Sequence, residues 1–86
     1  MADDQQIART IRDYITREYA DALQGALIDA STPLISSGLI DSLSMVSLKM
    51  FLDQTYRLRI PDAEASAEAF DSVSLIVKVL RRLGVK

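Results

Sequence analysis

A serine near the middle of the chain stands where a helix is expected to begin. Ser42 follows Asp41 and opens an apolar-rich stretch that runs to Tyr56. The first backbone N–H groups of a helix have no intrahelical partner and the helix dipole is positive there, so a phosphate ester on this hydroxyl would be well placed. Asp and Ser before an apolar run are also an ordinary helix start. The local pattern therefore predicts either a serine that carries a phosphate-linked group or a simple cap.

Hydrolytic chemistry at Ser42 is not expected. The sequence contains no histidine and no cysteine, which removes the usual general base, the thiolate nucleophile and the common zinc ligands. A serine hydroxyl without a base on the same turn is not activated as a nucleophile. A solvated face that complements a helix start explains Asp62, Glu64 and Glu68 without a metal or a catalytic carboxylate pair. We therefore expect a protein that is not an enzyme.

Composition restricts the class of protein further. The 86 residues suffice for one small domain, 1–86, and the 49% hydrophobic and 26% charged content is typical of a compact fold. The net charge of −2, with only 6% aromatic residues, argues against nucleic-acid binding. No apolar run approaches the roughly 20 residues that span a bilayer, and the first residues are acidic where a signal peptide is basic. We expect a cytoplasmic monomer with no membrane span.

The apolar periodicity predicts an all-α domain of three main helices and one short one. The first helix is expected from a cap at Asp3 or Asp4 to about Ala20, with Ile7, Ala8, Ile11, Tyr14, Ile15 and Tyr19 on one face. A long loop over 21–40, with a short turn around 22–28, needs apolar anchors, for which Leu27, Ile28, Leu34 and Leu39 are available. The other expected elements are a helix over 42–56, a short helix over 61–69, and a last helix capped by Asp71 or Ser72, with Val73, Ile76, Val77, Leu80 and Leu83 inward and Gly84 past its end.

The helix over 42–56 carries two apolar stripes. At roughly 100° per residue, one arc holds Met45, Leu48, Phe51, Leu52 and Tyr56, and the arc roughly opposite holds Leu43, Val46 and Met50. The first arc is expected in the core. The second cannot face the same core, so it either packs against the loop or stays partly exposed for a partner. Because this arc begins beside Ser42, we favour partner contact.

The text from Pro33 to Asp62, PLISSGLIDSLSMVSLKMFLDQTYRLRIPD, resembles the acyl carrier and peptidyl carrier protein family. The likeness is strong over about a third of the chain and extends more loosely through Phe70-Asp71-Ser72-Val73. It implies a small carrier-type four-helix bundle with a long loop between its first two helices. It also implies 4'-phosphopantetheine, donated by coenzyme A, on the serine of the Asp-Ser-Leu motif, which is Ser42.

This resemblance implies that the chain is a carrier. A phosphopantetheinyl transferase would attach the arm, and an adenylating ligase or an acyltransferase would load an acyl or aminoacyl group as a thioester for a downstream synthase. Asp41, Leu43, Val46, Lys49 and Met50 are the residues expected to contact these partners.

The helix over 42–56 departs from the fatty-acid type of carrier, in which this helix is rich in acids. Only Asp53 lies inside it, Lys49 is positive, and Arg57 and Arg59 follow. We therefore favour a discrete carrier of a polyketide or nonribosomal peptide pathway. The alternatives are a fatty-acid or specialised lipid carrier and, further away, an unmodified helical interaction module.

Overall fold

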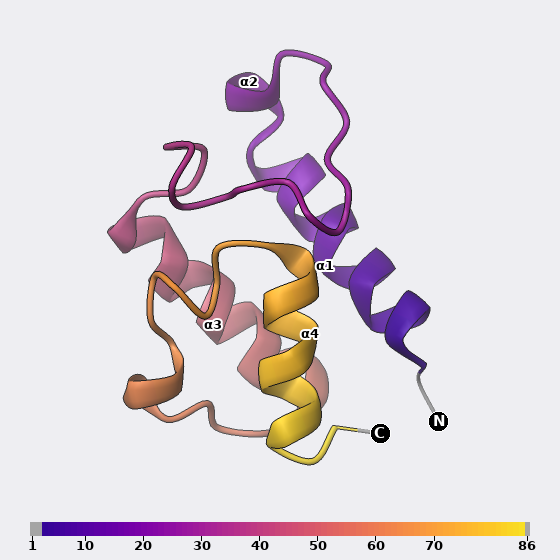
Figure 1. Ribbon diagram of the computed structural model, residues 1–86, viewed down its shortest axis with the longest axis vertical. Helices are drawn as coiled ribbons and strands as arrows, with labels where there is room; N and C mark the ends of the chain where they lie inside the picture. Colours follow the sequence, from indigo (N-terminus) through magenta and orange to yellow (C-terminus); the bar gives the residue numbers. More distant parts are fainter. Residues whose placement is uncertain (1–2, 86) are drawn as a thin grey trace.

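The computed structural model describes residues 3–85, and at Ser42 it describes the backbone alone. The described residues form helices and no strands, so the all-α prediction is confirmed (Figure 1). In chain order the elements are α1 (Asp4–Glu18), α2 (Ala20–Leu23), α3 (Ser42–Tyr56), the 3-10 helix η1 (Asp62–Glu64) and α4 (Val73–Arg82). No helix in this part of the chain has the length and apolar character needed to cross a membrane.

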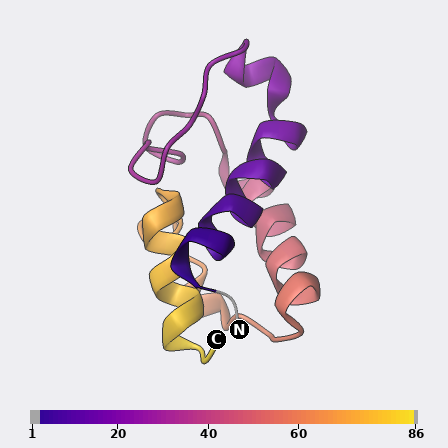
Figure 2. The ribbon, with the colours of Figure 1, turned by 90° about the vertical axis from the view of Figure 1, so that its right-hand side faces the viewer.

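Helix α1 begins and packs as its sequence predicts. The carboxylate of Asp3 accepts a hydrogen bond of 2.8 Å from the backbone N–H of Gln6, which makes Asp3 the cap. Of the predicted face, Ile7, Ile11, Tyr14 and Ile15 are buried. Ala8 and Tyr19 are only partly buried, and Tyr19 lies just beyond the last residue of the helix, Glu18. This face packs against α4, and an ion pair of 2.6 Å between Arg81 and Asp4 joins the two helices at one end (Figures 1 and 2).

The predicted core stripe of α3 is confirmed. Leu48 and Leu52 are fully buried, while Met45, Phe51 and Tyr56 are partly buried and pack against the core. The ring of Phe51 stacks on Tyr14 of α1 with a centroid separation of 4.1 Å. Burial of this one stripe therefore fixes the rotation of α3 about its own axis.

Helix α4 is capped by Ser72, whose hydroxyl accepts a hydrogen bond of 3.2 Å from the N–H of Leu75. The predicted inward residues are buried, apart from Leu83, which is partly buried. Val79 is buried as well, which the predicted face did not include. Gly84 has a φ of +99° just beyond the helix, the left-handed conformation that glycine adopts at such an end.

The short helix predicted over 61–69 is wrong in its length. Only the single turn η1 forms, because the backbone leaves the helical region at Ala65, where ψ is 54°. The hydroxyl of Ser66 then accepts a hydrogen bond of 3.1 Å from the N–H of Ala69 and stabilises a separate turn. Similarly, the turn expected around 22–28 is the one-turn helix α2, which ends at Gln24 in the left-handed region with a φ of 51°.

The long loop after α2 is held down by apolar side chains, but not by all those predicted. Ile28 and Leu34 are buried and Leu39 is partly buried, whereas Leu27 is 91% exposed. Only one side of the loop faces the core at this point, so Ile28 is buried while its neighbour Leu27 is left in solvent. A further anchor is Ile40, which is fully buried immediately before α3.

Candidate functional site

Asp41, and not Ser42, caps α3. Its backbone is extended, and its Oδ1 accepts a hydrogen bond of 2.7 Å from the N–H of Ser44. This hydrogen bond is the main cause that lowers the pKa of Asp41 below the ordinary aspartate value. Ser42 is the first residue of the helix, and its side chain lies outside the part that the structure describes. The N-terminus of α3 is therefore stabilised by the Asp41 carboxylate.

The segment that leads to Ser42 is anchored from within the core. Ile40 is fully buried, and its N–H donates a hydrogen bond of 2.9 Å to the carbonyl of Leu34. Gly38, with a φ of +84°, supplies the left-handed turn before it. Asp41 is already exposed, so the chain passes from core to surface within one residue of the helix start.

Asp71 holds the other end of this segment, and sequence reasoning missed that role. Its Oδ1 accepts hydrogen bonds from the N–H groups of Leu34, Ile35 and Ser36 at 3.1, 2.7 and 2.8 Å. Its carbonyl oxygen accepts a second hydrogen bond from Leu34, at 2.7 Å. The sequence offered Asp71 or Ser72 as the cap of α4; once Ser72 is the cap, Asp71 is free to bind the loop. One carboxylate thus ties the start of α4 to the loop before α3.

Acid should weaken this attachment. The hydrogen bond from Ser36 is the largest cause that lowers the pKa of Asp71 in the folded chain. A lowered folded pKa contributes stability that is present above the unfolded pKa and lost as the pH falls through the folded pKa. We therefore expect wild type to have a higher free energy of unfolding than Asp71→Asn. The difference between the two should be constant above about pH 5 and should shrink progressively below about pH 4.

Urea denaturation of both chains across this range measures the difference. Asp71→Ala, which removes the acceptor as well as the charge, should be less stable than Asp71→Asn at neutral pH, because the N–H groups of Ile35 and Ser36 lose their partner while that of Leu34 keeps the carbonyl of residue 71. A gap between wild type and Asp71→Asn that does not change down to about pH 2.5 would contradict this account.

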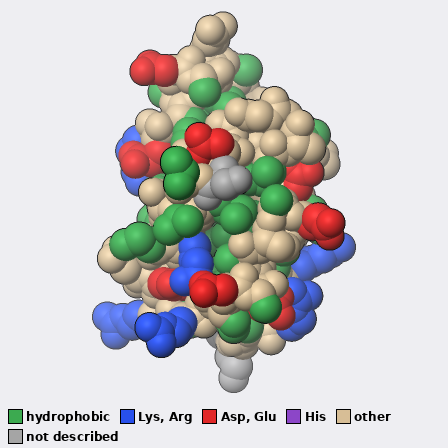
Figure 3. Space-filling view, turned by 90° about the vertical axis from the view of Figure 1, so that its left-hand side faces the viewer, with side chains coloured by type: hydrophobic (Ala, Val, Ile, Leu, Met, Phe, Trp, Pro, Cys, Tyr) green, Lys and Arg blue, Asp and Glu red, His purple; other side chains and the backbone are tan. Residues whose placement is uncertain are grey.

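The second apolar stripe of α3 is exposed. Leu43 is 82% exposed, Val46 53% and Met50 54%. These three are most of the large exposed hydrophobic side chains in the described residues; the others are Leu27 and Leu75. A groove of about 290 Å³ runs beside the stripe toward η1, and hydrophobic side chains gather on this face of the molecule (Figure 3). The groove is lined by Met45, Val46, Lys49, Met50, Asp62 and Ala65.

Lys49 lies beside this stripe but is paired. Its ammonium is 3.1 Å from Oδ2 of Asp53, one turn along α3, and the side chains of both residues are largely buried. The other carboxylate oxygen of Asp53 accepts a hydrogen bond of 2.9 Å from the N–H of Ile60. The one acid inside the helix therefore holds the chain that follows α3 and neutralises Lys49, so neither charge is freely available to a partner. Sequence spacing placed these residues one turn apart but did not reveal the bond to Ile60.

The acids near η1 do not gather into one site. Glu64 forms an ion pair with Arg82 of α4, Asp62 lines the groove beside α3, and Glu68 is exposed. Among residues 3–85, no group of three His, Cys, Asp or Glu side chains is placed to hold a metal ion. In the described part of the chain, the features around Ser42 are therefore a capped helix start and an exposed apolar stripe.

Comparison of the chain with protein-family models, with curated proteins and with solved structures finds no match.

Proposed function

We propose that this protein is a discrete carrier that holds an acyl or aminoacyl group on a 4'-phosphopantetheine arm attached to Ser42. The observation that carries the proposal is the exposed stripe of Leu43, Val46 and Met50, which begins one residue after Ser42. A monomer has no structural need to keep three large apolar side chains in water along one helix face, whereas a docking surface does. The order of a long α1, a long loop, α3, short η1 and α4 supports the carrier type of four-helix bundle.

The residues around Ser42 fit such an arm. Ser42 opens a helix of 15 residues, and Asp41 and Leu43 on either side of it are both exposed, so an enzyme can approach this position. Asp41 already satisfies the N–H of Ser44, which leaves the Ser42 hydroxyl unnecessary as a cap. When attached, the arm supplies a terminal thiol, which this cysteine-free chain lacks, and an acyl group is carried there as a thioester.

The chain itself would provide the docking surface. Tethering keeps the cargo at a high effective concentration for an enzyme that has docked beside Ser42. The contact must be released after each step, which suits a few apolar anchors on one helix better than a large interface. The expected partners are a phosphopantetheinyl transferase, a loading ligase or acyltransferase, and a downstream synthase.

Intact-mass measurement tests the proposal directly. We expect the purified chain, incubated with coenzyme A, magnesium and a promiscuous phosphopantetheinyl transferase, to gain the mass of one phosphopantetheine. A known carrier treated in parallel is the positive control. No gain by this chain while the control is fully converted would make it an unmodified helical interaction module.

A charge placed in the apolar stripe should impair docking without unfolding the chain. We expect Val46→Glu or Met50→Glu to slow arm transfer by about tenfold or more, because a carboxylate must be desolvated at the contact. The midpoint of thermal unfolding should hardly change, since exposed positions usually alter stability by about 0.5 kcal/mol or less. Thr55→Glu, exposed on α3 away from the stripe, adds the same charge and should transfer normally. Equal slowing by all three variants would show that the stripe is not the contact.

Surface charge separates a polyketide or nonribosomal peptide carrier from a fatty-acid carrier. The only acid inside α3, Asp53, is engaged by Lys49 and Ile60, so α3 presents little negative charge to a basic docking patch. We therefore expect malonyl transfer by a fatty-acid transacylase to be slow. Ser47 and Gln54 are exposed one turn beyond Leu43 and Met50, and changing both to Glu should speed this transfer, less so as salt rises. Transfer to wild type at the rate of a genuine fatty-acid carrier would favour the fatty-acid alternative.

A further inference from the structure

A groove between α1 and α4 is lined by cationic side chains that have no partner in residues 3–85. We propose that this groove binds an acidic helix of a partner protein, at a surface separate from Ser42. The proposal goes beyond the carrier function, because it assigns a second interaction surface to elements other than α3.

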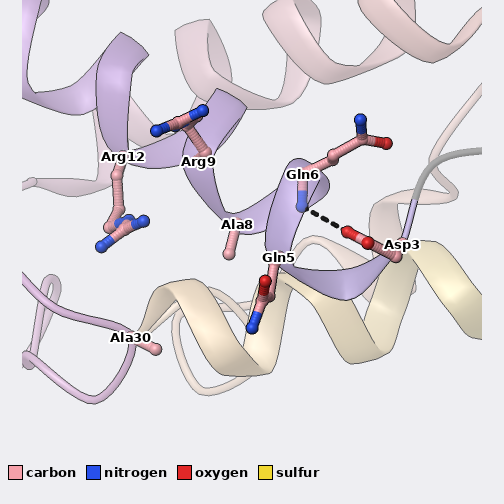
Figure 4. Close-up of a pocket in the computed structure, with 7 residues that line it drawn as sticks. All are labelled: Asp3, Gln5, Gln6, Ala8, Arg9, Arg12 and Ala30. Carbon is pink, nitrogen blue, oxygen red and sulfur yellow. Dashed lines mark hydrogen bonds between the residues drawn. The ribbon is translucent and has the colours of Figure 1, made fainter.

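Two adjoining hollows form the groove. The first, of about 430 Å³, is lined by α1 and the loop, and Figure 4 shows Arg9 and Arg12 pointing away from the α1 backbone on its rim. The second, of about 280 Å³, continues toward α4 and reaches Val77 and Lys78. The two hollows share Gln5, Ala8 and Ala30. Small alanine side chains in this shared part allow the backbone of a partner to come close.

The three cations of the groove are Arg9, Arg12 and Lys78. None of them makes an ion pair or hydrogen bond with another residue of the described chain. Arg12 is half-buried as a residue, and none of its five N–H donors bonds an acceptor within the described chain. An external carboxylate would supply the missing acceptor.

The acids nearby offset this charge only in part. Asp3 and Asp4 also line the groove; Asp3 caps α1 through the N–H of Gln6, and Asp4 pairs with Arg81. Asp29, next to Ala30 in the loop, accepts hydrogen bonds from Ser31 and Thr32 of its own turn. Asp13 lies one turn beyond Arg9 but forms no ion pair with it within the described residues. With Asp4 paired to Arg81, the lining holds three cations against one other carboxylate, Asp3, so the groove is positive although the whole chain carries −2.

The spacing of the arginines favours a helical partner. Arg9 and Arg12 are three residues apart on α1, which is an axial separation of about 4.5 Å. Acids at every third or fourth residue of a partner helix are separated along its axis by nearly the same distance as Arg9 and Arg12. Two acids on neighbouring turns of such a helix can therefore pair with these two arginines. A nucleic-acid strand is disfavoured, because none of the described lining residues is aromatic and could stack on a base.

The groove and the apolar stripe lie on different sides of the molecule. Figures 2 and 3 view the chain from opposite directions: α1 and α4 lie toward the viewer in Figure 2, and the face in Figure 3 is the one on the side of α3 and η1. One partner could therefore remain on the groove while another works at Ser42.

A titration followed by NMR tests the groove. The probe is a helical peptide of repeated Glu-Ala-Ala-Ala units, and the observed signals are the side-chain Nε–H groups of the arginines. We expect saturable shifts at Arg9 and Arg12 that weaken as salt rises, with little change at Arg57 and Arg59, which are exposed and lie outside the groove. A single-stranded oligonucleotide of the same charge serves as the competitor. Shifts of equal size at all four arginines, no saturable binding, or equally strong binding of the oligonucleotide would overturn the proposal.

Charge reversal gives the matched control. Arg9→Glu with Arg12→Glu should weaken peptide binding by roughly tenfold or more, because two attractive contacts become repulsive. Arg57→Glu with Arg59→Glu changes the net charge by the same amount and should weaken it by less than about twofold. Equal losses in the two double variants would mean that overall charge, and not the groove, binds the peptide. Circular dichroism checks that both charge-reversal variants are folded. The neutral double variant Arg9→Gln with Arg12→Gln is a milder change, and its affinity for the peptide must also fall.

Discussion

Ser42→Ala should abolish attachment of the phosphopantetheine arm while leaving the fold unchanged. The hydroxyl is the only atom of this side chain that can form the phosphate ester, so the expected loss in the intact-mass assay is complete. The free energy of unfolding should change by less than about 0.5 kcal/mol, because Asp41 caps α3 and alanine is a good helix former. Urea denaturation of both chains measures the second quantity.

A matched control separates this effect from a general disturbance of α3. Ser47 is exposed on the same helix, and Ser47→Ala should accept the arm as wild type does. If Ser42→Ala still gains the mass of the arm, the attachment site is another residue and the central assignment is wrong. If Ser42→Ala is unmodified but also largely unfolded, the role of Asp41 as the sufficient cap is wrong instead.

Leu48→Ala should cause a large loss of stability. Leu48 is fully buried on the face of α3 that packs into the core, and truncating such a side chain typically costs about 2 to 5 kcal/mol. Domains are stabilised by roughly 0.05 to 0.15 kcal/mol per residue, so 86 residues have about 4 to 13 kcal/mol in total. One truncation therefore removes a large share of the stability, and thermal unfolding should shift by about 4 to 8 °C for each kcal/mol.

Val46→Ala is the paired measurement for this prediction. Val46 lies only two residues away on the same helix but is 53% exposed, so its truncation should cost about 0.5 kcal/mol or less. Leu52→Ala, at a second fully buried position, should resemble Leu48→Ala. Equal thermal losses at Val46 and Leu48 would contradict the division of α3 into a core stripe and an exposed stripe.

Helical periodicity predicted the parts of this fold that depend on neighbours along one helix. Spacing alone found the buried faces of α1 and α4 and both stripes of α3, because residues three and four apart share a face wherever a helix forms. For the caps of α1 and α4 the sequence left two neighbours each, Asp3 or Asp4 and Asp71 or Ser72, because a cap acts on backbone N–H groups two or three residues away; the structure selects Asp3 and Ser72. The candidate site at Ser42 likewise came from the local motif and its resemblance to carrier proteins.

Predictions that needed long-range information were less successful. Leu27, expected as a loop anchor, is almost fully exposed, and the bond from Asp53 to Ile60, beside the Lys49–Asp53 pair, was not predicted. For these residues an apolar or charged type was compatible with several environments, and the neighbours in space decided among them. The helix expected to reach residue 69 stops at Glu64 for a local reason, the separate turn that Ser66 makes with Ala69.

By itself, then, the sequence determined the all-α class, the starts of α1, α3 and α4 to within one residue, the two stripes of α3 and the position of Ser42 at a helix start. Only the tertiary structure decided that the stripe of Leu43, Val46 and Met50 is left open, that Asp71 binds a loop more than 30 residues earlier in the chain, and that Arg9, Arg12 and Lys78 line a common groove. The physical reason is the range of the interactions. Periodicity and capping act over three or four residues, whereas exposure and charge pairing depend on which distant segments pack together.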